Sequence, residues 1–343
     1  MSTQSRAATQ ATAPAPGDTV EMTYREAINA ALTDEMAADP AVLIMGEDVA
    51  SDGGVYKTNA GLLERFGPQR IMNTPICENT FTGVALGMSL MGMRPVVEFM
   101  FSDFLPTAAD AIVNQLPKYR YMSGGTCFVP VTILSASGAT GRFGTQHSAT
   151  GESWYMGLPG LRVVTAATPG SAYSLLRAAI RDNNPVIFHM HKGLWGRKGP
   201  VTRGQLAEVG KAAVLREGGD VTILATMLMV HRALEAADTL ATMGIEAEVI
   251  DLRWIRPLDL HTVRKSVGRT GRLLVLEEQV HSGGWGATVI SRLAADGTSW
   301  RAAPKAVSLP DHLLMPYSPN LEDQMLPSTA VCVDAARALC GRT

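Results

Sequence analysis

Short apolar runs alternate along the chain with stretches in which apolar residues recur every three or four positions. The first such stretch follows residues 23–26 (TYRE), which have the spacing of a capping box. It continues with helical period from Ile28 and ends before Pro40. Residues 41–45 (AVLIM) then form a continuous apolar run, which is typical of a strand buried on both faces. The pattern therefore predicts a helix followed by an interior strand.

The same alternation continues to the C-terminal region. In the first half we expect strands at 71–76, 94–101, 129–134, 161–166 and 186–190, with helices at 80–91, 106–122 and 170–181. In the second half we expect strands at 221–225, 246–251, 272–276 and 305–309, with helices at 231–243, after Pro257 and at 286–295. The strand at 305–309 is the last expected element. Alternating strands and helices predict an α/β fold in which both halves are parallel-sheet units.

The length of 343 residues is too great for one small core, so we expect two domains. Residues 192–210 hold glycines, Pro200 and mixed charge without a clear period, and we place the boundary there. The expected parts are a disordered tail at 1–17, a first domain at 18–195, a linker at 196–210 and a second domain at 211–343. The tail has no apolar core, which argues against a secretory signal, and its single arginine makes a poor transit peptide.

Charged residues make up 18% of the chain and hydrophobic residues 46%. Since about 25% charged residues is usual, we expect part of the surface to be covered by another chain. The net charge of -2 gives no footprint for nucleic acid. No apolar run reaches the roughly 18–20 residues that cross a bilayer. The four cysteines form no CxxC pair, which favours reduced thiols and a cytoplasmic location over disulfides or a zinc site.

Common ligand-binding motifs are missing or incomplete. The nearest approach to a GxGxxG motif, residues 138–144, leads into Gln146-His147-Ser148 rather than into a helix, which weakens a nicotinamide-binding interpretation. Neither GxxxxGK[ST] nor GxSxG occurs. His189 and His191 lie on one face of an expected strand, but no third metal ligand is evident nearby, and we expect solvated or interface histidines.

Two polar residues stand out by their surroundings. Glu78 is the only residue with a formal charge between Ile71 and Met93. It either complements the dipole of a helix in its first turn or is a carboxylate held in an apolar pocket. In such a pocket its pKa would be raised by desolvation, and it could share a proton with a heterocyclic nitrogen. His147 lies in a glycine-rich loop after a strand end, where α/β sheets place their sites; a loop histidine with local partners is the alternative.

Several stretches together resemble one family. They are GEDV at 46–49, NTPICENTFTG at 73–83, GMRPVVEFMFSDF at 92–104, AIVNQLPKYRYMSGG at 111–125, GTQHS at 144–148, LPGLRVV at 158–164, AAIRDNNPV at 178–186 and MPYSPNLED at 315–323. In this order and spacing they resemble the beta subunit of the thiamin-diphosphate-dependent decarboxylating component of 2-oxo acid dehydrogenase complexes. The pyruvate and acetoin dehydrogenase types are the most similar.

The resemblance implies an N-terminal thiamin-diphosphate-binding domain of pyrimidine type and a C-terminal domain of transketolase C-terminal type. It implies an α2β2 heterotetramer, with the cofactor between unlike subunits and Mg²⁺ bound mainly by the GDG…NN motif of the alpha subunit. No such motif occurs in this chain. It further implies oxidative decarboxylation of pyruvate, or acetoin cleavage, with acyl transfer to the lipoyl group of a transacylase partner.

The resemblance also assigns residues. Glu78 corresponds to the glutamate that hydrogen-bonds N1′ of the aminopyrimidine, and His147 to the histidine that acts in acyl transfer to the lipoyl arm. Met100 and Phe104 correspond to residues that pack on the aminopyrimidine, with ordinary core packing as the alternative. A structural potassium site, built largely from backbone oxygens, corresponds to Val131, Ala179, Ile180, Asp182 and Asn184. A plain helix stop is the alternative reading of the Asp182–Asn184 segment.

This chain departs from the family pattern at a few positions. Ala149 and Thr150 follow Gln146-His147-Ser148 where QHSQS is frequent, Cys77 precedes the glutamate where Ser or Ala is frequent, and Asn73 stands where Asp is usual. No catalytic group is removed, but the substrate stays open. A branched-chain 2-oxo acid dehydrogenase beta subunit is one alternative. A non-catalytic scaffold is another, against which the presence of both Glu78 and His147 argues.

Overall fold

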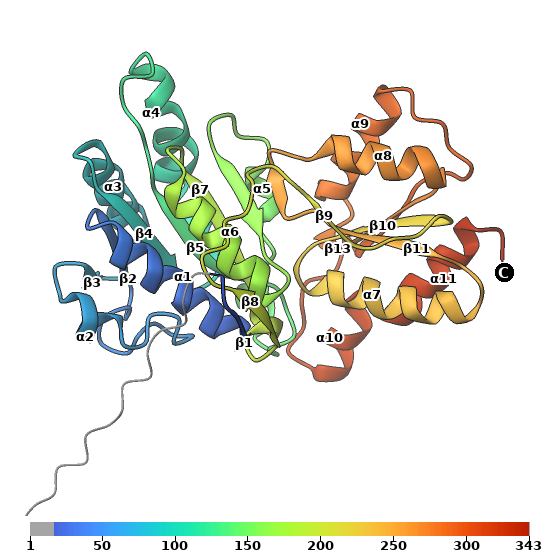
Figure 1. The fold of residues 1–343 in the computed structure, drawn as a ribbon, viewed down its shortest axis with the longest axis horizontal. Coiled ribbons are helices and arrows are strands. Elements are labelled where there is room, and N and C mark those ends of the chain that lie inside the picture. Colours follow the sequence, from blue (N-terminus) through green and yellow to red (C-terminus); the bar gives the residue numbers. More distant parts are fainter. Residues whose placement is uncertain (1–16, 343) are drawn as a thin grey trace, which may run out of the picture.

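The computed structural model describes residues 17–342, and every statement below refers to that part of the chain. Within it the strands form a seven-stranded, a five-stranded and a two-stranded sheet. Figure 1 shows two units side by side, the first coloured blue to green and the second yellow to red. The expected two-unit α/β fold is confirmed, but the larger sheets are mixed rather than purely parallel. The expected tail at 1–17 lies outside the described residues except for Gly17.

The first unit is built on the seven-stranded sheet. In spatial order its strands are β12 (Trp254–Arg256), β6 (Arg162–Thr165), β7 (Val186–His191), β5 (Thr132–Ser137), β4 (Arg94–Phe99), β2 (Val42–Gly46) and β3 (Ile71–Asn73). Neighbouring strands from β6 to β3 are parallel, whereas β12 runs antiparallel to β6. Because β12 comes from the second half of the sequence, the two units share this sheet.

Helices cover both faces of the seven-stranded sheet. One face carries α1 (Tyr24–Ala38) and α6 (Pro169–Arg181), and the other carries α3 (Glu78–Leu90), the 3₁₀ helix η1 (Ser102–Ala108), the π-helical turn η2 (Asp110–Gln115) and α4 (Leu116–Met122). Successive strand residues alternate between the two layers: Val96 packs with α1 and α6, whereas Val97 packs with α3 and η1. This period of two explains why the strands read as continuous apolar runs.

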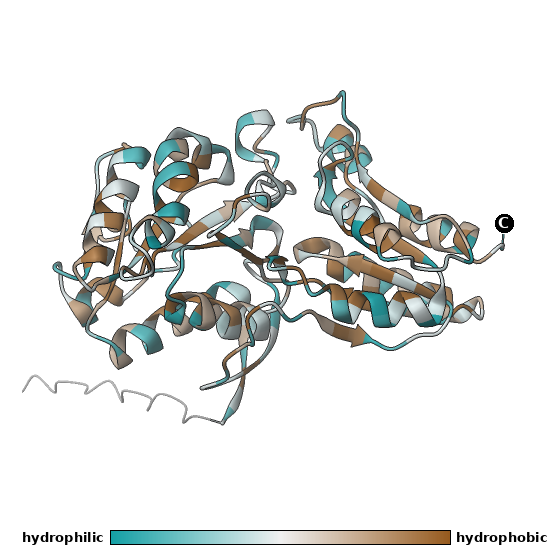
Figure 2. Ribbon diagram, turned by 90° about the horizontal axis from the view of Figure 1, so that it is seen from above, coloured by the Kyte–Doolittle hydropathy of each residue, from teal (hydrophilic) through white to brown (hydrophobic). Residues whose placement is uncertain are grey.

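The second unit repeats this plan. Its sheet consists of β14 (Lys305–Leu309), β13 (Leu273–Val280), β10 (Val221–Ala225), β11 (Ala247–Asp251) and β9 (Ala213–Arg216). Only the β9–β11 pair is antiparallel. The helices α7 (Met227–Thr242) and α11 (Thr329–Leu339) pack on one face, and α8 (Leu260–Thr270) and α9 (Trp285–Ala295) pack on the other. Figure 2 shows the brown, hydrophobic strands in the interior of both units.

The ends of the second unit differ from the sequence expectation. The strand at 305–309 is not the last element, because α10 (Pro319–Met325) and α11 follow it. The stretch expected as a linker, 196–210, contains β8 (Lys198–Thr202), which pairs antiparallel with β1 (Thr19–Thr23). Shorter elements occupy the loops: α2 (Leu62–Phe66), η3 (Thr145–His147), α5 (Glu152–Tyr155) and η4 (Lys192–Leu194).

Helix starts follow the local sequence signals. Thr23 caps α1, and the expected capping box is complete: Glu26 N–H donates to Thr23 Oγ1 at 3.2 Å, and Thr23 N–H donates to Glu26 Oε2 at 2.7 Å. Pro169 occupies the first turn of α6, as expected. All four cysteines are free thiols. Among residues 17–342, no helix combines the length and the apolar character needed to span a membrane.

Candidate functional site

Three neighbouring parallel strands bring chemically interesting residues to one edge of the seven-stranded sheet. Gly46, the last residue of β2, pairs with Asn73 at the end of β3 and with Glu98 near the end of β4. Glu47 and Met100 therefore leave the sheet on the same side as the segment that leads to Glu78. The carboxyl ends of parallel strands are the usual place for ligand sites in α/β folds.

Glu78 is the first residue of α3 and is half-buried, so its expected position in a first helical turn is confirmed. The expected apolar enclosure, however, is not formed by the described part of this chain. Ile76 is 80% exposed beside it, and Met91 at the far end of the helix is 85% exposed. The described residues thus leave a large apolar side chain exposed at each end of α3. An exposed apolar surface of this kind typically marks an interface.

Glu47 is a functional candidate that the sequence reasoning missed. Its side chain is 8% exposed, and among the described residues Glu47 Oε1 has no hydrogen-bond partner. Burial raises the pKa of Glu47, and the carboxylates of Glu78 and Asp48 raise it further. Two carboxyl groups thus interact at this edge, and one buried oxygen is left for a ligand group to satisfy. The available signal was a glutamate directly after a buried strand.

The loop after β2 is fastened to a third carboxylate. Glu98 accepts hydrogen bonds from Thr58 Oγ1 at 3.0 Å and from Asn59 Nδ2 at 2.7 Å, and burial raises its pKa. Gly54, at φ +80°, leaves no room for a side chain, because a Cβ there would lie 2.7 Å from Glu98 Oε1. These contacts hold the loop that begins at Glu47 in one conformation.

Aromatic ring contacts connect His147 with Phe104, two of the predicted site residues. The His147 ring lies edge-on to Phe101, with 4.7 Å between ring centroids, and to Phe104, with 5.5 Å. Phe104 also packs against the main core cluster, as the core-packing alternative expects, and its contact with an aminopyrimidine stays a prediction. Met100 and Phe104 are both half-buried, which leaves part of each surface free. Phe101 is a contact of His147 that sequence reasoning missed.

His189 and His191 are fully buried, which corrects the expectation of solvated histidines. His189 Nδ1 lies 2.8 Å from Ser137 Oγ, and burial lowers the pKa of His189 to about 3. His191 Nε2 lies 2.9 Å from Glu278 Oε2 of β13, so His191 stands at the contact between the two units. Across residues 17–342, no three His, Cys, Asp or Glu side chains gather as metal ligands would.

The five residues of the predicted potassium site lie near the amino ends of β5 and β7, away from Glu78. They do come together, but their oxygens already accept protein hydrogen bonds. Arg94 Nη1 donates to the carbonyls of Ile180 at 3.0 Å and Asp182 at 3.1 Å. Val131 and Ala179 carbonyls accept from backbone N–H groups, and Arg120 donates to Asn184 Oδ1 at 2.7 Å. Because a carbonyl has two acceptor positions, a potassium ion there would share these oxygens with Arg94.

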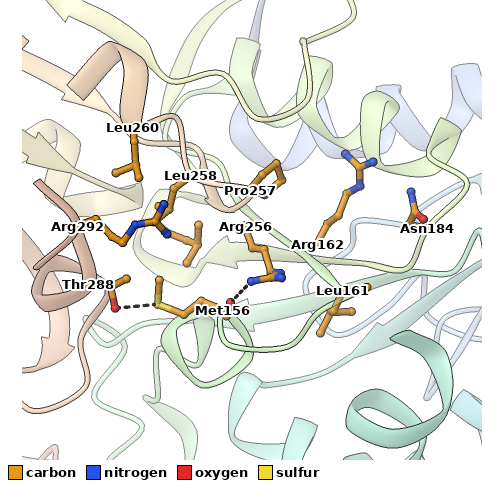
Figure 3. Close-up of a pocket in the computed structure, with 12 residues that line it drawn as sticks. Met156, Leu161, Arg162, Asn184, Arg256, Pro257, Leu258, Leu260, Thr288 and Arg292 are labelled. Carbon is orange, nitrogen blue, oxygen red and sulfur yellow. Dashed lines mark hydrogen bonds between the residues drawn. The ribbon is translucent and has the colours of Figure 1, made fainter. Parts of the chain in front are cut away.

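A cavity of about 530 Å³ lies between the units but contains none of the residues at the Glu78 edge. Figure 3 shows Arg256 donating to the Met156 carbonyl, at 2.8 Å, and Thr288 Oγ1 pointing to Met156 Sδ, at 3.8 Å. Arg162 and Asn184, from the opposite end of the first sheet, also line it. The cavity is therefore separate from the edge that carries Glu78 and His147.

Comparison with known proteins matches both halves of the chain. Residues 20–197 match the transketolase pyrimidine binding domain, and residues 210–331 match the transketolase C-terminal domain. The pyruvate dehydrogenase E1 component subunit beta-2 of Oryza sativa subsp. japonica is 43% identical over 327 residues, covering 94% of this chain and 87% of the relative. The subunit beta of pyruvate dehydrogenase E1 of Rhizobium meliloti is 41% identical, covering 95% of this chain and 72% of the relative.

A further relative and one solved structure complete the comparison. The beta subunit of acetoin:2,6-dichlorophenolindophenol oxidoreductase of Cupriavidus necator is 42% identical, covering 92% of this chain and 97% of the relative. The solved structure of a split gene transketolase, described as an inactive beta4 tetramer, is 25% identical with a TM-score of 0.77. It covers 93% of this chain and 98% of that chain.

Proposed function

The chain belongs to the family of pyruvate dehydrogenase E1 and acetoin oxidoreductase beta subunits, built from a transketolase pyrimidine binding domain and a transketolase C-terminal domain, and from that premise we propose its function. It is the beta subunit of a 2-oxo acid dehydrogenase complex and acts on pyruvate or acetoin together with an alpha subunit. The observation that carries this proposal is the half-built site at Glu78, with its orphaned neighbour Glu47 and its open apolar side.

The described residues fit one half of a thiamin diphosphate site. Glu78 holds and exchanges a proton at N1′ of the aminopyrimidine, while Glu47 offers a buried carboxyl oxygen beside it. Met100 and Phe104 provide half-buried surface for a flat ring. When bound, the cofactor supplies the electron sink for loss of CO₂ from a 2-oxo acid or for acetoin cleavage. The diphosphate and Mg²⁺ are held mainly by the alpha subunit.

His147 acts in the second half of the reaction. It moves a proton as the acyl group passes to the lipoyl group of a transacylase. Its ring is oriented by Phe101 and Phe104, and its half-buried position leaves one side accessible. A non-catalytic scaffold would not need this arrangement of Glu78, Glu47 and His147.

The substrate is pyruvate or acetoin, because the relatives described above carry these two activities in their names. The branched-chain alternative is not indicated by them. A structural potassium ion shared with Arg94 at Ile180 and Asp182, and a cytoplasmic location, complete the proposal.

The test is to co-express the chain with its alpha subunit and to record the native mass and the bound cofactor. An α2β2 assembly that retains thiamin diphosphate supports the proposal. Oxidative decarboxylation of pyruvate and of a branched-chain 2-oxo acid is then compared with cleavage of acetoin, each with a dye as electron acceptor. A chain that binds the cofactor and turns over substrate alone would contradict it, since this chain would then have to hold the diphosphate itself.

A further inference from the structure

The loop that carries His147 is tied to the second unit of the chain. We call residues 138–150, between β5 and α5, the His147 loop. Near its start, Ala139 N–H donates to Glu278 Oε1 of β13 at 2.6 Å, and Thr140 N–H donates to Glu322 Oε1 of α10 at 2.8 Å. Both carboxylates are buried. Hydrogen bonds from backbone N–H to a buried carboxylate are among the stronger ones, so the start of the loop is fixed by the second unit.

The remainder of the His147 loop has further ties to the same unit. Arg142 pairs with Asp323 at 2.9 Å and with Glu322. At the far end, Thr150 Oγ1 donates to the Glu278 carbonyl, and Gln279 Nε2 donates to the Thr150 carbonyl at 2.9 Å. Contacts from β13 and α10 therefore hold both ends of the loop.

Between these ends, Lys192 reaches His147 directly. Lys192 Nζ donates to the His147 carbonyl and lies 4.9 Å from the Phe101 ring centroid and 5.4 Å from that of Phe143. Lys192 is only 7% exposed. Since Phe101 also contacts the His147 ring, Lys192 supports both the backbone and the aromatic surroundings of the imidazole.

The charge of Lys192 is embedded among several ionisable groups. Burial lowers the pKa of Lys192 to about 8, while Asp103 of η1, Glu278 of β13 and Glu322 of α10 oppose that shift. His191 pairs with Glu278, and Arg142 pairs with Glu322. A lysine with this pKa is mostly cationic at neutral pH, so its contacts with the two aromatic faces are cation–π contacts.

We infer that Lys192, which follows β7 of the first unit, is a positioning residue for His147, and that Glu278 of the second unit holds the loop in which Lys192 acts. Lys192 fixes the backbone at the histidine, and Glu278 fixes both ends of the loop. This inference rests on the proposed function of His147. A methionine at position 192 would fill similar space but could neither donate to the carbonyl nor attract the two rings.

The test uses the assembly with the alpha subunit and thiamin diphosphate. The variants are Lys192→Met, Lys192→Arg, His147→Ala and the double variant Lys192→Met/His147→Ala. Lys211→Met, at an exposed lysine of the segment before β9, is the matched control. Three quantities are measured: hydrogen exchange of amides 144–149, dye-coupled decarboxylation, and acyl transfer to a lipoyl domain.

We expect Lys192→Met to speed exchange of these amides by about tenfold, as for loss of one charged hydrogen bond. Acyl transfer falls by about 10-fold to 100-fold, because a small misplacement of a reacting group is costly. Dye-coupled decarboxylation changes by less than about threefold, because it does not need His147. The double variant is no slower in transfer than His147→Ala, and Lys192→Arg restores part of both losses by keeping the charge.

Two outcomes separate failure of this inference from failure of the proposed function. Unchanged exchange in Lys192→Met and in Lys192→Arg overturns the inference, whatever the activities. An equal fall in dye-coupled decarboxylation and transfer overturns it also, because it indicates general damage. If exchange speeds up but His147→Ala transfers acyl groups normally, the positioning by Lys192 stands and the role proposed for His147 falls.

Discussion

Glu78 and His147 lie on the same side of one sheet, yet their surroundings are completed in opposite ways. Glu78 starts a helix whose neighbouring apolar side chains, Ile76 among them, face outward without cover from residues 17–342. His147 lies in a loop bound at both ends by Glu278 and in the middle by Lys192. The Glu78 region, which we call the open region, is left uncovered by the described residues. The His147 loop, which we call the enclosed region, is held in place by contacts within the chain.

In the proposed function, this difference places the cofactor chemistry at Glu78 and the acyl transfer at His147 in two separate regions. The cofactor region depends on assembly, so its activity should follow the concentration of the alpha subunit. The transfer region depends on the internal contact between the two units, so its activity should follow the integrity of that contact. Substitutions in the Glu78 region should therefore lower dye-coupled decarboxylation, whereas substitutions around His147 should lower acyl transfer.

The largest effect is expected at the carboxylate of the open region. Glu78→Ala removes the proton-exchanging group and should lower dye-coupled decarboxylation by about 10²-fold to 10⁴-fold. Because Glu78 is half-buried at a helix start, the free energy of unfolding should change by less than about 1 kcal/mol. Steady-state kinetics and urea unfolding measure the two quantities. Glu64→Ala, at an exposed position of α2, is the control. Normal rates in the Glu78→Ala enzyme would show that Glu78 is not part of the active site.

Substitutions among the contacts that hold the His147 loop should lower the stability of the folded chain. Glu278→Ala leaves the Ala139 N–H and the His191 ring without their buried carboxylate, which should cost about 3 kcal/mol of unfolding free energy. Urea unfolding of the assembled protein, followed by tryptophan fluorescence, measures this loss. Glu217→Ala, at an exposed glutamate, should change little. A loss below about 1 kcal/mol at Glu278 would show that the two units are held together elsewhere.

The enclosed region should also give stability a pH dependence. Burial raises the pKa of Glu152, just after the His147 loop, from 4.5 to about 8. The folded chain therefore keeps this proton between about pH 4.5 and 8 while the unfolded chain releases it, so stability falls as pH rises through that window. Glu152→Gln should remove the part of this slope that is due to the Glu152 carboxyl and be about 2 kcal/mol more stable at pH 8, after the cost of burying an amide.

Unfolding midpoints at pH 5 and pH 8 measure the effect at Glu152. A slope should remain in this variant, because burial also raises the pKa of Glu277 to about 7 and that of Asp251 to about 6. A Glu152→Gln enzyme with the wild-type slope would mean that another group is responsible.

The smallest effect is expected at the rim of the open region. Ile76→Asp places a charge on the exposed apolar surface beside Glu78 and should weaken assembly with the alpha subunit by about tenfold. Sedimentation analysis over a range of concentrations measures the affinity. Met243→Asp, at an exposed methionine of the second unit, is the matched control. Equal affinities for the two variants would place the interface on another surface.

Much of the open region could be predicted, because its signals are local. The isolated carboxylate at Glu78 and the helix after it follow from neighbouring residues, and His147 follows a strand end. The contacts that hold the His147 loop in the enclosed region could not be predicted from local signals. The contact between Lys192 and His147 spans 45 positions, and that between Glu278 and Ala139 spans 139. Only the folded arrangement of the two units brings these pairs together.

The fold shows the same limit. Continuous apolar runs predict the central strands of both sheets, because burial on both faces leaves a strong pattern. β12 has only three residues, and its partner β6 belongs to the other half of the chain. The sequence does contain signals for the two final helices, which were not predicted: Pro319 lies in the first turn of α10, and Ser328 caps α11.

The crossing of β12 into the first sheet bears on how this protein can be divided. A fragment ending in the segment between the units would lack β12 and would expose the outer edge of β6. Unpaired strand edges recruit other chains, so such a fragment should aggregate even though its own helices and most of its sheet are complete. Gene splitting, fusion or permutation would need to keep Trp254–Arg256 with the first half, and the exchange of this strand between molecules offers a route to intertwined dimers.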